Sequence, residues 1–216
     1  MALTKTRRTQ AERSAETRGR LLQATLDSLV EAGLAGTTTL AVCHRAGVSH
    51  GSLLHHYGTR ERMLAAALAE VYDRLRTRVV EGLEALPPGE ARLDALVDLM
   101  WNVFGAPEFK AVLELWLASA NQPELGWQVR PEVAFFDAAI QPTADRLFPG
   151  VAERVPEFPV YVSLLFQLMQ GMGLARAALG EDEEARANRR RVLDLIKSLL
   201  RNAFAEADAR AEASDA

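Results

Sequence analysis

Apolar side chains recur at positions i, i+3, i+4 and i+7 along most of the chain, which is the spacing of one face of an α-helix. Stripes of this kind run through residues 15–32, 60–85, 109–120 and 192–200. No segment shows the apolar–polar alternation that is typical of a β-strand. The pattern therefore predicts an all-α fold.

Glycine, proline and asparagine interrupt these stripes and set the number of helices. The breaks fall at residues 33–36, 86–89, 105–107, 121–123, 148–150 and 180. They predict about nine helices.

Charge and aromatic content divide the chain into two parts with different inventories. Residues 1–62 hold nine Lys and Arg against five Asp and Glu, whereas residues 63–216 hold 16 against 24. All four histidines lie in the first part, and 12 of the 14 aromatic residues lie beyond residue 100. We expect a separate domain with a basic N-terminal arm in residues 1–62, a helical bundle in residues 63–205, and a flexible tail in residues 206–216.

Two short helices joined by a tight turn are predicted inside the first part. The threonine pair at 37–38 can cap a helix that ends near Arg45. Gly47 permits the turn, and Ser49 caps a second helix that ends near Tyr57. This arrangement is a helix-turn-helix, so the first part is expected to be a three-helix DNA-binding domain.

The second of these helices would expose short or flat hydrogen-bonding groups, which suit base edges in the major groove. Its predicted outward side chains are His50, Ser52, Leu54, His55 and His56. Cations for phosphate contact are Arg45 and Arg60 at helix ends and, in the arm, Lys5, Arg7, Arg8, Arg13, Arg18 and Arg20. The partner predicted by this pattern is double-stranded DNA.

Residues 15–64 resemble the DNA-binding domain of TetR-family (TetR/AcrR-like) transcriptional regulators. The matching features are Glu31-Ala-Gly33, Thr37-Thr38, Arg45-Ala-Gly-Val-Ser49, Gly51, His55-His56-Tyr57 and Thr59-Arg60-Glu61. The resemblance implies nine or ten helices, an Ω-shaped homodimer, operator binding and release by a small ligand.

The resemblance also assigns phosphate contacts to Thr38, Ser49 and Arg60. The sequence departs from the family at two positions. His50 stands where a basic residue is common, and Leu54 stands where an aromatic residue is common. The resemblance therefore implies DNA binding without defining the operator sequence.

Residues 160–179 are apolar nearly all round, so a helix there must be buried on opposite sides. One side can meet the domain's own core, and the other predicts a second subunit. The expected interface residues are Leu168, Gly171, Met172, Ile196 and Leu199. The 16-residue apolar run from Val160 to Ala175 is interpreted as too short and too polar for a membrane span.

The aromatic inventory of the second part predicts an apolar pocket with a few polar groups, although a solid core would use the same residues. The expected lining is Trp101, Asn102, Phe104, Trp116, Phe135, Tyr161, Gln167, Met169 and Gln170. Ser163 shares a polar stripe with Gln167 and Gln170, which could serve a pocket or an interface. Few cations lie nearby, so the effector is expected to be small, mostly apolar, and uncharged or weakly cationic.

Several classes of site find no support in the sequence. Cys43 is the single cysteine, which excludes an intramolecular disulfide and favours a small core residue. The histidines lack metal-ligand spacing, so we expect no metal and no cofactor. The first 20 residues lack a signal-peptide pattern, so a cytoplasmic protein is expected.

A ligand-responsive repressor is the leading functional hypothesis. A TetR-like activator or a regulator gated by a protein remains open, because the sign of regulation depends on operator position. An α-helical enzyme is the remote alternative, since no nucleophile–base pair or phosphate loop is present. A helical adaptor that binds no DNA is a further alternative.

Overall fold

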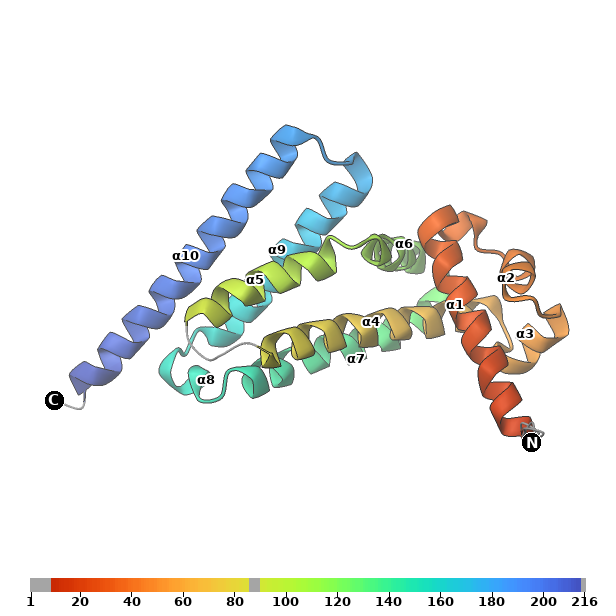
Figure 1. Ribbon diagram of the computed structural model, residues 1–216, viewed down its shortest axis with the longest axis horizontal. Coiled ribbons are helices and arrows are strands. Elements are labelled where there is room, and N and C mark those ends of the chain that lie inside the picture. The colour runs from red at the N-terminus through yellow and green to blue at the C-terminus, as the bar shows by residue number, and fades with distance from the viewer. Residues whose placement is uncertain (1–8, 86–89, 215–216) are drawn as a thin grey trace, which may run out of the picture. The chain divides into compact units, whose positions relative to one another are not determined.

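The structure is a computed structural model that describes residues 9–85 and 90–214. Within these residues it has ten helices and no β-strand, so the all-α prediction is confirmed (Figure 1). The helices are α1 (Gln10–Gly36), α2 (Thr39–Ala46), α3 (His50–Tyr57), α4 (Arg60–Glu84), α5 (Glu90–Phe104), α6 (Pro107–Asn121), α7 (Pro123–Leu147), α8 (Val151–Arg154), α9 (Phe158–Leu179) and α10 (Glu183–Ser214). The sequence predicts about nine, and the four-residue α8 brings the described count to ten.

The chain forms two compact units. The first combines residues up to Glu70 with Ala111–Glu132, and the second combines Val71–Lys110 with the chain from Val133 onward. Helices α4, α6 and α7 therefore contribute to both units. The domain boundary expected from the sequence, after residue 62, assigns residues 111–132 to the second domain. Their contacts in the structure assign them to the first unit.

Helices α1, α2 and α3 close over a small apolar core in the first unit. Its buried side chains are Leu21, Ala24, Val42, Cys43, Ala46, Leu53, Tyr57 and Met63. Burial raises the pKa of the Cys43 thiol, so the reactive thiolate is scarce at neutral pH. The sequence interpretation of Cys43 as a core residue agrees with this position.

In the second unit, α9 and α10 run antiparallel, with α5 packed against both (Figure 1). The Phe104 ring meets Phe109 and Phe166 edge-on, with centroids 4.8 and 5.0 Å apart. A Cβ on Gly173 would lie 2.6 Å from the Phe104 carbonyl oxygen, so glycine allows α9 and α5 to approach closely. Ion pairs Lys197–Asp98 and Arg201–Asp94 join α10 to α5.

Helix α10 extends beyond its predicted limit, whereas α9 does not. α9 spans 22 residues, covers the predicted helical segment 160–179 and begins two residues earlier, at Phe158. By length and composition, α9 is the one helix in the described part of the chain that could cross a membrane. α10 continues to Ser214 through the segment expected to be a flexible tail. Alanine, glutamate and arginine are strong helix formers, and this composition favours the extension.

Candidate nucleic-acid interface

The joint between α2 and α3 is fixed by local hydrogen bonds. Thr38 caps α2 by accepting from the Ala41 amide at 3.1 Å, and Ser49 caps α3 by accepting from the Ser52 amide at 3.2 Å. Gly47 ends α2 in the left-handed conformation, with φ +64°. Both capping hydroxyls accept in these bonds, so each retains a proton that can be donated to a phosphate.

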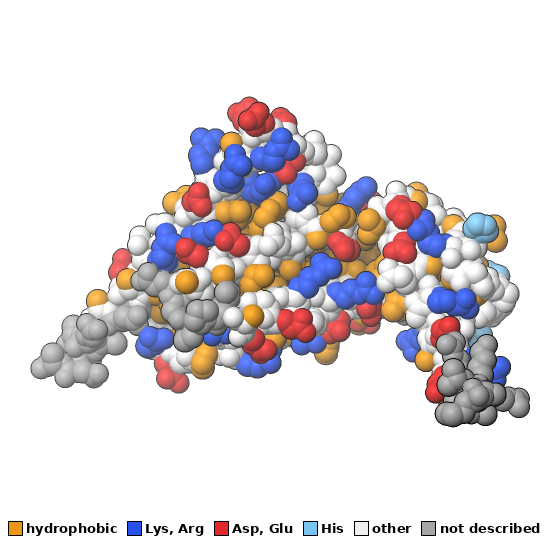
Figure 2. Space-filling model, in the orientation of Figure 1, with side chains coloured by type: hydrophobic (Ala, Val, Ile, Leu, Met, Phe, Trp, Pro, Cys, Tyr) orange, Lys and Arg blue, Asp and Glu red, His pale blue; other side chains and the backbone are white. Residues whose placement is uncertain are grey.

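The exposed side of α3 carries the side chains that the sequence predicts to face outward. His50 and His55 are exposed, Leu54 is 44% exposed, and Ser52 and His56 are half-buried. The opposite side buries Leu53 and Tyr57 in the core. In Figure 2 the histidine side chains lie only over the α2–α3 part of the visible face. DNA contact by these residues stays a prediction.

The arginines predicted to contact phosphate also take part in the fold of the first unit. Arg45 forms a two-pronged ion pair with Glu31, with 3.0 Å between Nη1 and Oε1, and this bond lowers the pKa of Glu31. Arg60 donates to the carbonyl oxygens of Thr37 at 3.0 Å and Leu34 at 2.9 Å. Replacing Arg60 would therefore weaken the end of α1 as well as any phosphate contact.

The remaining cations of the predicted arm divide into two groups. Lys5, Arg7 and Arg8 lie outside the described residues. Arg13, Arg18 and Arg20, which were expected in the arm, lie in α1 instead, because Thr9 and Glu12 form a capping box that starts this helix at Gln10. Arg18 lies near the Tyr57 ring, and its carbonyl oxygen accepts from the Tyr57 hydroxyl at 3.1 Å.

A carboxylate from α6 completes the end of α1. Gly33 interrupts the helix with φ +66° and ψ −176°, so the next amide leaves the helical ladder. Glu114 accepts from this Leu34 amide at 2.5 Å, and Arg60 binds the carbonyl of the same residue. Sequence reasoning missed this contact of Glu114, since Glu114 lies 80 positions from Leu34 and only the fold brings them together.

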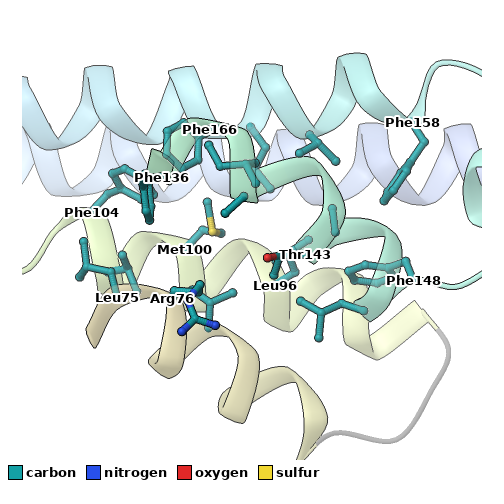
Figure 3. Close-up of a pocket in the computed structure, with 18 residues that line it drawn as sticks. Leu75, Arg76, Leu96, Met100, Phe104, Phe136, Thr143, Phe148, Phe158 and Phe166 are labelled. Atoms are coloured by element: carbon teal, nitrogen blue, oxygen red, sulfur yellow. The ribbon is translucent and has the colours of Figure 1, made fainter. Parts of the chain in front are cut away.

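The second unit contains an apolar cavity of about 110 Å³. It is lined by Leu75, Arg76, Val79, Leu96, Met100, Val103, Phe104, Phe136, Ala139, Ile140, Thr143, Ala144, Leu147, Phe148, Phe158, Val162, Leu165 and Phe166. Figure 3 shows Phe104, Phe136 and Phe166 together at one end and Phe148 and Phe158 at the other. Arg76 is the one charged residue of the lining, and its guanidinium lies 2.6 Å from Asp73.

Of the residues predicted to line a pocket, Phe104 belongs to the lining of this cavity and the others do not. Trp101 lies instead under the guanidinium groups of Arg176 and Arg189, at 5.8 and 4.6 Å from its ring centroid. Met169 is fully buried in the core, and Phe135 is 76% exposed. Asn102 is exposed, Trp116 belongs to the first unit, and Tyr161 packs in the cluster around Phe158. Helix periodicity gives the face of each side chain but not the neighbour that this face meets.

Comparison with known proteins gives the family of this chain. Residues 21–67 match the bacterial regulatory proteins of the tetR family. An HTH-type transcriptional regulator of Mycobacterium bovis is 31% identical over 178 residues, which cover 82% of this chain and 90% of the relative. The chain belongs to the TetR family. It is therefore a transcriptional regulator with a DNA-binding domain, and the helix-turn-helix of α2 and α3 is part of that domain.

Other TetR-family relatives and solved structures match over shorter or more divergent alignments. The regulator CymR of Pseudomonas putida is 35% identical over 119 residues, covering 55% of this chain and 59% of CymR. A transcriptional regulator from Rhodococcus sp. Rha1 shares the fold with a TM-score of 0.62 and 24% identity, covering 84% and 94% of the two chains. The multidrug binding protein EbrR, solved with imidazole, gives a TM-score of 0.60 and 22% identity, covering 83% and 93%.

A second hollow in this TetR-family protein is more polar than the first cavity and has a volume of about 290 Å³; we call it the polar hollow. It lies between α7 and α9 and is lined by Asp137, Ile140, Gln141, Val162, Ser163, Phe166, Gln167 and Gln170. Three of these residues form the polar stripe that the sequence predicts on α9. Gln167 and Gln170, which were predicted for the apolar pocket, thus belong to a separate but adjoining hollow. Within the described residues no cluster of three or more His, Cys, Asp or Glu is placed to hold a metal ion.

The residues predicted for a subunit interface lie on α9 and α10. Gly171 is open, since a Cβ there would meet nothing within 4 Å, and Leu199 is exposed. Leu168, Met172 and Ile196 are half-buried. Further exposed leucine and valine side chains on the same two helices are Val160, Leu164, Leu174, Leu179 and Leu195. Their contact with a second subunit stays a prediction.

Proposed function

We propose that this TetR-family regulator is a homodimeric repressor that a small, mostly apolar molecule releases from operator DNA. The observation that carries the proposal is the apolar cavity in the second unit. Protein interiors are normally close-packed, and this cavity of about 110 Å³ leaves its apolar lining without packing partners, which costs stability. A ligand that fills the cavity would offset this cost.

The exposed face of α3 supports binding in the major groove. A recognition helix of eight residues presents its N-terminal side chains to base edges, while hydroxyls and cations at helix ends meet phosphates. Two such helices must lie about 34 Å apart to reach successive turns of B-DNA. We therefore assign operator recognition to a two-fold dimer and place the protein in the cytoplasm, where chromosomal DNA is accessible.

The apolar surface of α9 and α10 supports that dimer. Only 28% of the most apolar 18-residue stretch of α9 is buried within one chain. Much apolar surface of this helix is therefore left exposed. Val160, Leu164 and Gly171 recur at helical spacing on α9, and Leu195 and Leu199 do so on α10. Pairing of these two helices with their copies would bury the surface in a four-helix contact. We assign α9 to this interface rather than to a membrane.

Helix α4 supports a link between the ligand and the DNA-binding head. It begins at Arg60, which holds the end of α1, and its later residues Leu75, Arg76 and Val79 line the cavity. A ligand shifts the equilibrium only if it binds the DNA-incompetent state more tightly. The similar fold of EbrR, which was solved with ethidium, supports small organic molecules as the class of effector.

The test combines DNA binding with a cavity-filling variant. Purified protein is titrated onto DNA from beside its own gene, with and without a panel of small apolar metabolites. Ala139→Phe, inside the cavity, is expected to retain DNA binding and lose the ligand response. Ala138→Phe, the adjacent exposed position on α7, is the matched control and should respond normally.

Three results would contradict the proposal. One is the absence of specific DNA binding. Another is an unchanged response of Ala139→Phe to a ligand that releases the wild type. The third is a transcriptional reporter that shows activation rather than repression, which would support the activator alternative.

A further inference from the structure

The apolar cavity and the polar hollow share a wall. Ile140, Val162 and Phe166 line both of them, so movement of these three side chains would join the two spaces. Phe166 lies at the end of the cavity where Figure 3 places Phe104 and Phe136. A molecule with a polar end and an apolar end could therefore occupy both spaces at once.

The chemistry of the polar hollow distinguishes between possible head groups. Asp137 is its one charged residue, and the other polar groups are the amides of Gln141, Gln167 and Gln170 and the Ser163 hydroxyl. Asp137 is exposed, and among the described residues no hydrogen bond or ion pair engages it. Partial desolvation raises the pKa of its carboxyl. A bound ammonium group could pair with this carboxylate from inside the hollow.

The apolar cavity offers little to an anion. Arg76 is the single cation of its lining, and Asp73 already lies 2.6 Å from its guanidinium nitrogen. Three aromatic rings lie together beside the shared wall, because Phe166 is 5.0 Å from Phe104 and 5.8 Å from Phe136 between ring centroids. Aromatic faces attract cations and repel anions.

We propose that the two spaces form one ligand site for an organic amine, with a small apolar body in the cavity and the ammonium group at Asp137. The inference rests on the proposed function and names the class of its effector. One aromatic ring or a short alkyl chain is the upper limit for this body, because the cavity measures about 110 Å³ and is smaller than the cavity of about 150 Å³ that accommodates benzene.

The test uses three probes that share a benzyl group and differ in the head group, namely phenethylamine, phenethyl alcohol and phenylacetate. Calorimetric titrations measure each probe against the full-length wild type, Asp137→Asn and Glu153→Gln. Glu153 is exposed on α8 and lines neither space, so its variant controls for the loss of one negative charge.

The wild type should bind the amine about tenfold more tightly than phenylacetate. Asp137→Asn should remove this preference and leave the alcohol affinity unchanged, while Glu153→Gln should behave like the wild type. Equal affinities for amine and carboxylate, binding of no probe at millimolar concentration, or an unaltered preference in Asp137→Asn would overturn the inference. A change in sedimentation of Asp137→Asn without a change in amine affinity would also overturn it, since the hollow would then serve the dimer.

An operator-release assay on the same samples separates this inference from the proposed function. If the amine binds through Asp137 but leaves the operator occupied, the site stands and the repressor proposal fails. If all three probes release the operator equally and Asp137→Asn makes no difference, the repressor proposal stands and the amine site fails.

Discussion

Gly33 is the position where a single backbone conformation decides how α1 ends. Its φ of +66° with ψ −176° lies in a region that only glycine adopts readily. A Cβ would also lie 2.8 Å from the Glu114 carboxylate oxygen. The Leu34 amide can turn toward α6 only if residue 33 adopts this backbone conformation and leaves room for the Glu114 carboxylate. Glycine meets both requirements, because it tolerates the positive φ and has no Cβ.

Gly33→Ala should lower the free energy of unfolding by about 1–3 kcal/mol, because alanine is strained in this conformation. Gly19→Ala is the matched control within α1, where a Cβ would meet nothing within 4 Å. It should stabilise the protein by about 0.5–1 kcal/mol, as expected for glycine in a helix interior. Urea unfolding of both variants measures the difference, and equal stabilities would show that the Gly33 conformation carries no cost.

His50 is the exposed residue at the first position of α3, where base edges are within reach of a recognition helix. His50→Ala should weaken operator binding by about 1–3 kcal/mol and alter base preference, while the dependence on salt stays unchanged. Fluorescence anisotropy with operator and scrambled duplexes at several salt concentrations measures both effects. His44 is exposed on α2, outside the recognition helix. His44→Ala makes the same substitution there, so it is the matched control and should retain the base preference.

At the scale of elements, the end of α1 is joined to α4 and α6 through one residue. Leu34 donates its amide to Glu114 of α6 and presents its carbonyl oxygen to Arg60 of α4. The amide and the carbonyl of Leu34 thus take their hydrogen-bond partners from two different helices. The end of α1 therefore depends on side chains from outside the helix-turn-helix.

Glu114→Gln should lower the free energy of unfolding by about 1 kcal/mol, because a hydrogen bond to a neutral amide is weaker than one to a carboxylate. Amide hydrogen exchange at Leu34 should become faster than in the wild type. Glu124→Gln, an exposed position at the start of α7, should change neither quantity measurably. Unchanged exchange at Leu34 in Glu114→Gln would show that the contact does not order this joint.

At the scale of the whole molecule, we expect dimerisation to depend on apolar surface that stays exposed in a single chain. Leu164 on α9 is 50% exposed and lies among the side chains assigned to the dimer. Leu164→Glu should yield monomers at micromolar concentration, because a charge in an apolar interface loses its hydration without gaining a partner. Leu117→Glu, at a leucine of α6 that is 64% exposed, should remain dimeric.

Sedimentation velocity distinguishes these species by mass, and circular dichroism checks that both variants stay folded. The operator affinity of the Leu164→Glu monomer should fall, since one recognition helix reads only half of a two-fold site. A folded Leu164→Glu dimer would place the interface elsewhere on the molecule.

Local chemistry explains what could be predicted from the sequence by itself. The capping roles of Thr38 and Ser49, the Gly47 turn and the helix breaks before Pro107 and Pro123 all depend on residues within four positions of each other. Such short-range interactions are encoded in the order of residues and need no tertiary contact. The all-α class, the helix-turn-helix and the family resemblance followed from them.

Tertiary structure decided which distant side chains meet. Glu114 reaches the end of α1, Trp101 lies under two arginines instead of lining a cavity, and Asp137 joins the polar stripe of α9. Periodicity shows that a residue lies on an apolar or polar face of its helix, but the partner of that face depends on how several helices cross. The cavity was therefore expected in the correct half of the chain and built from different residues, because its lining comes from four helices packed together.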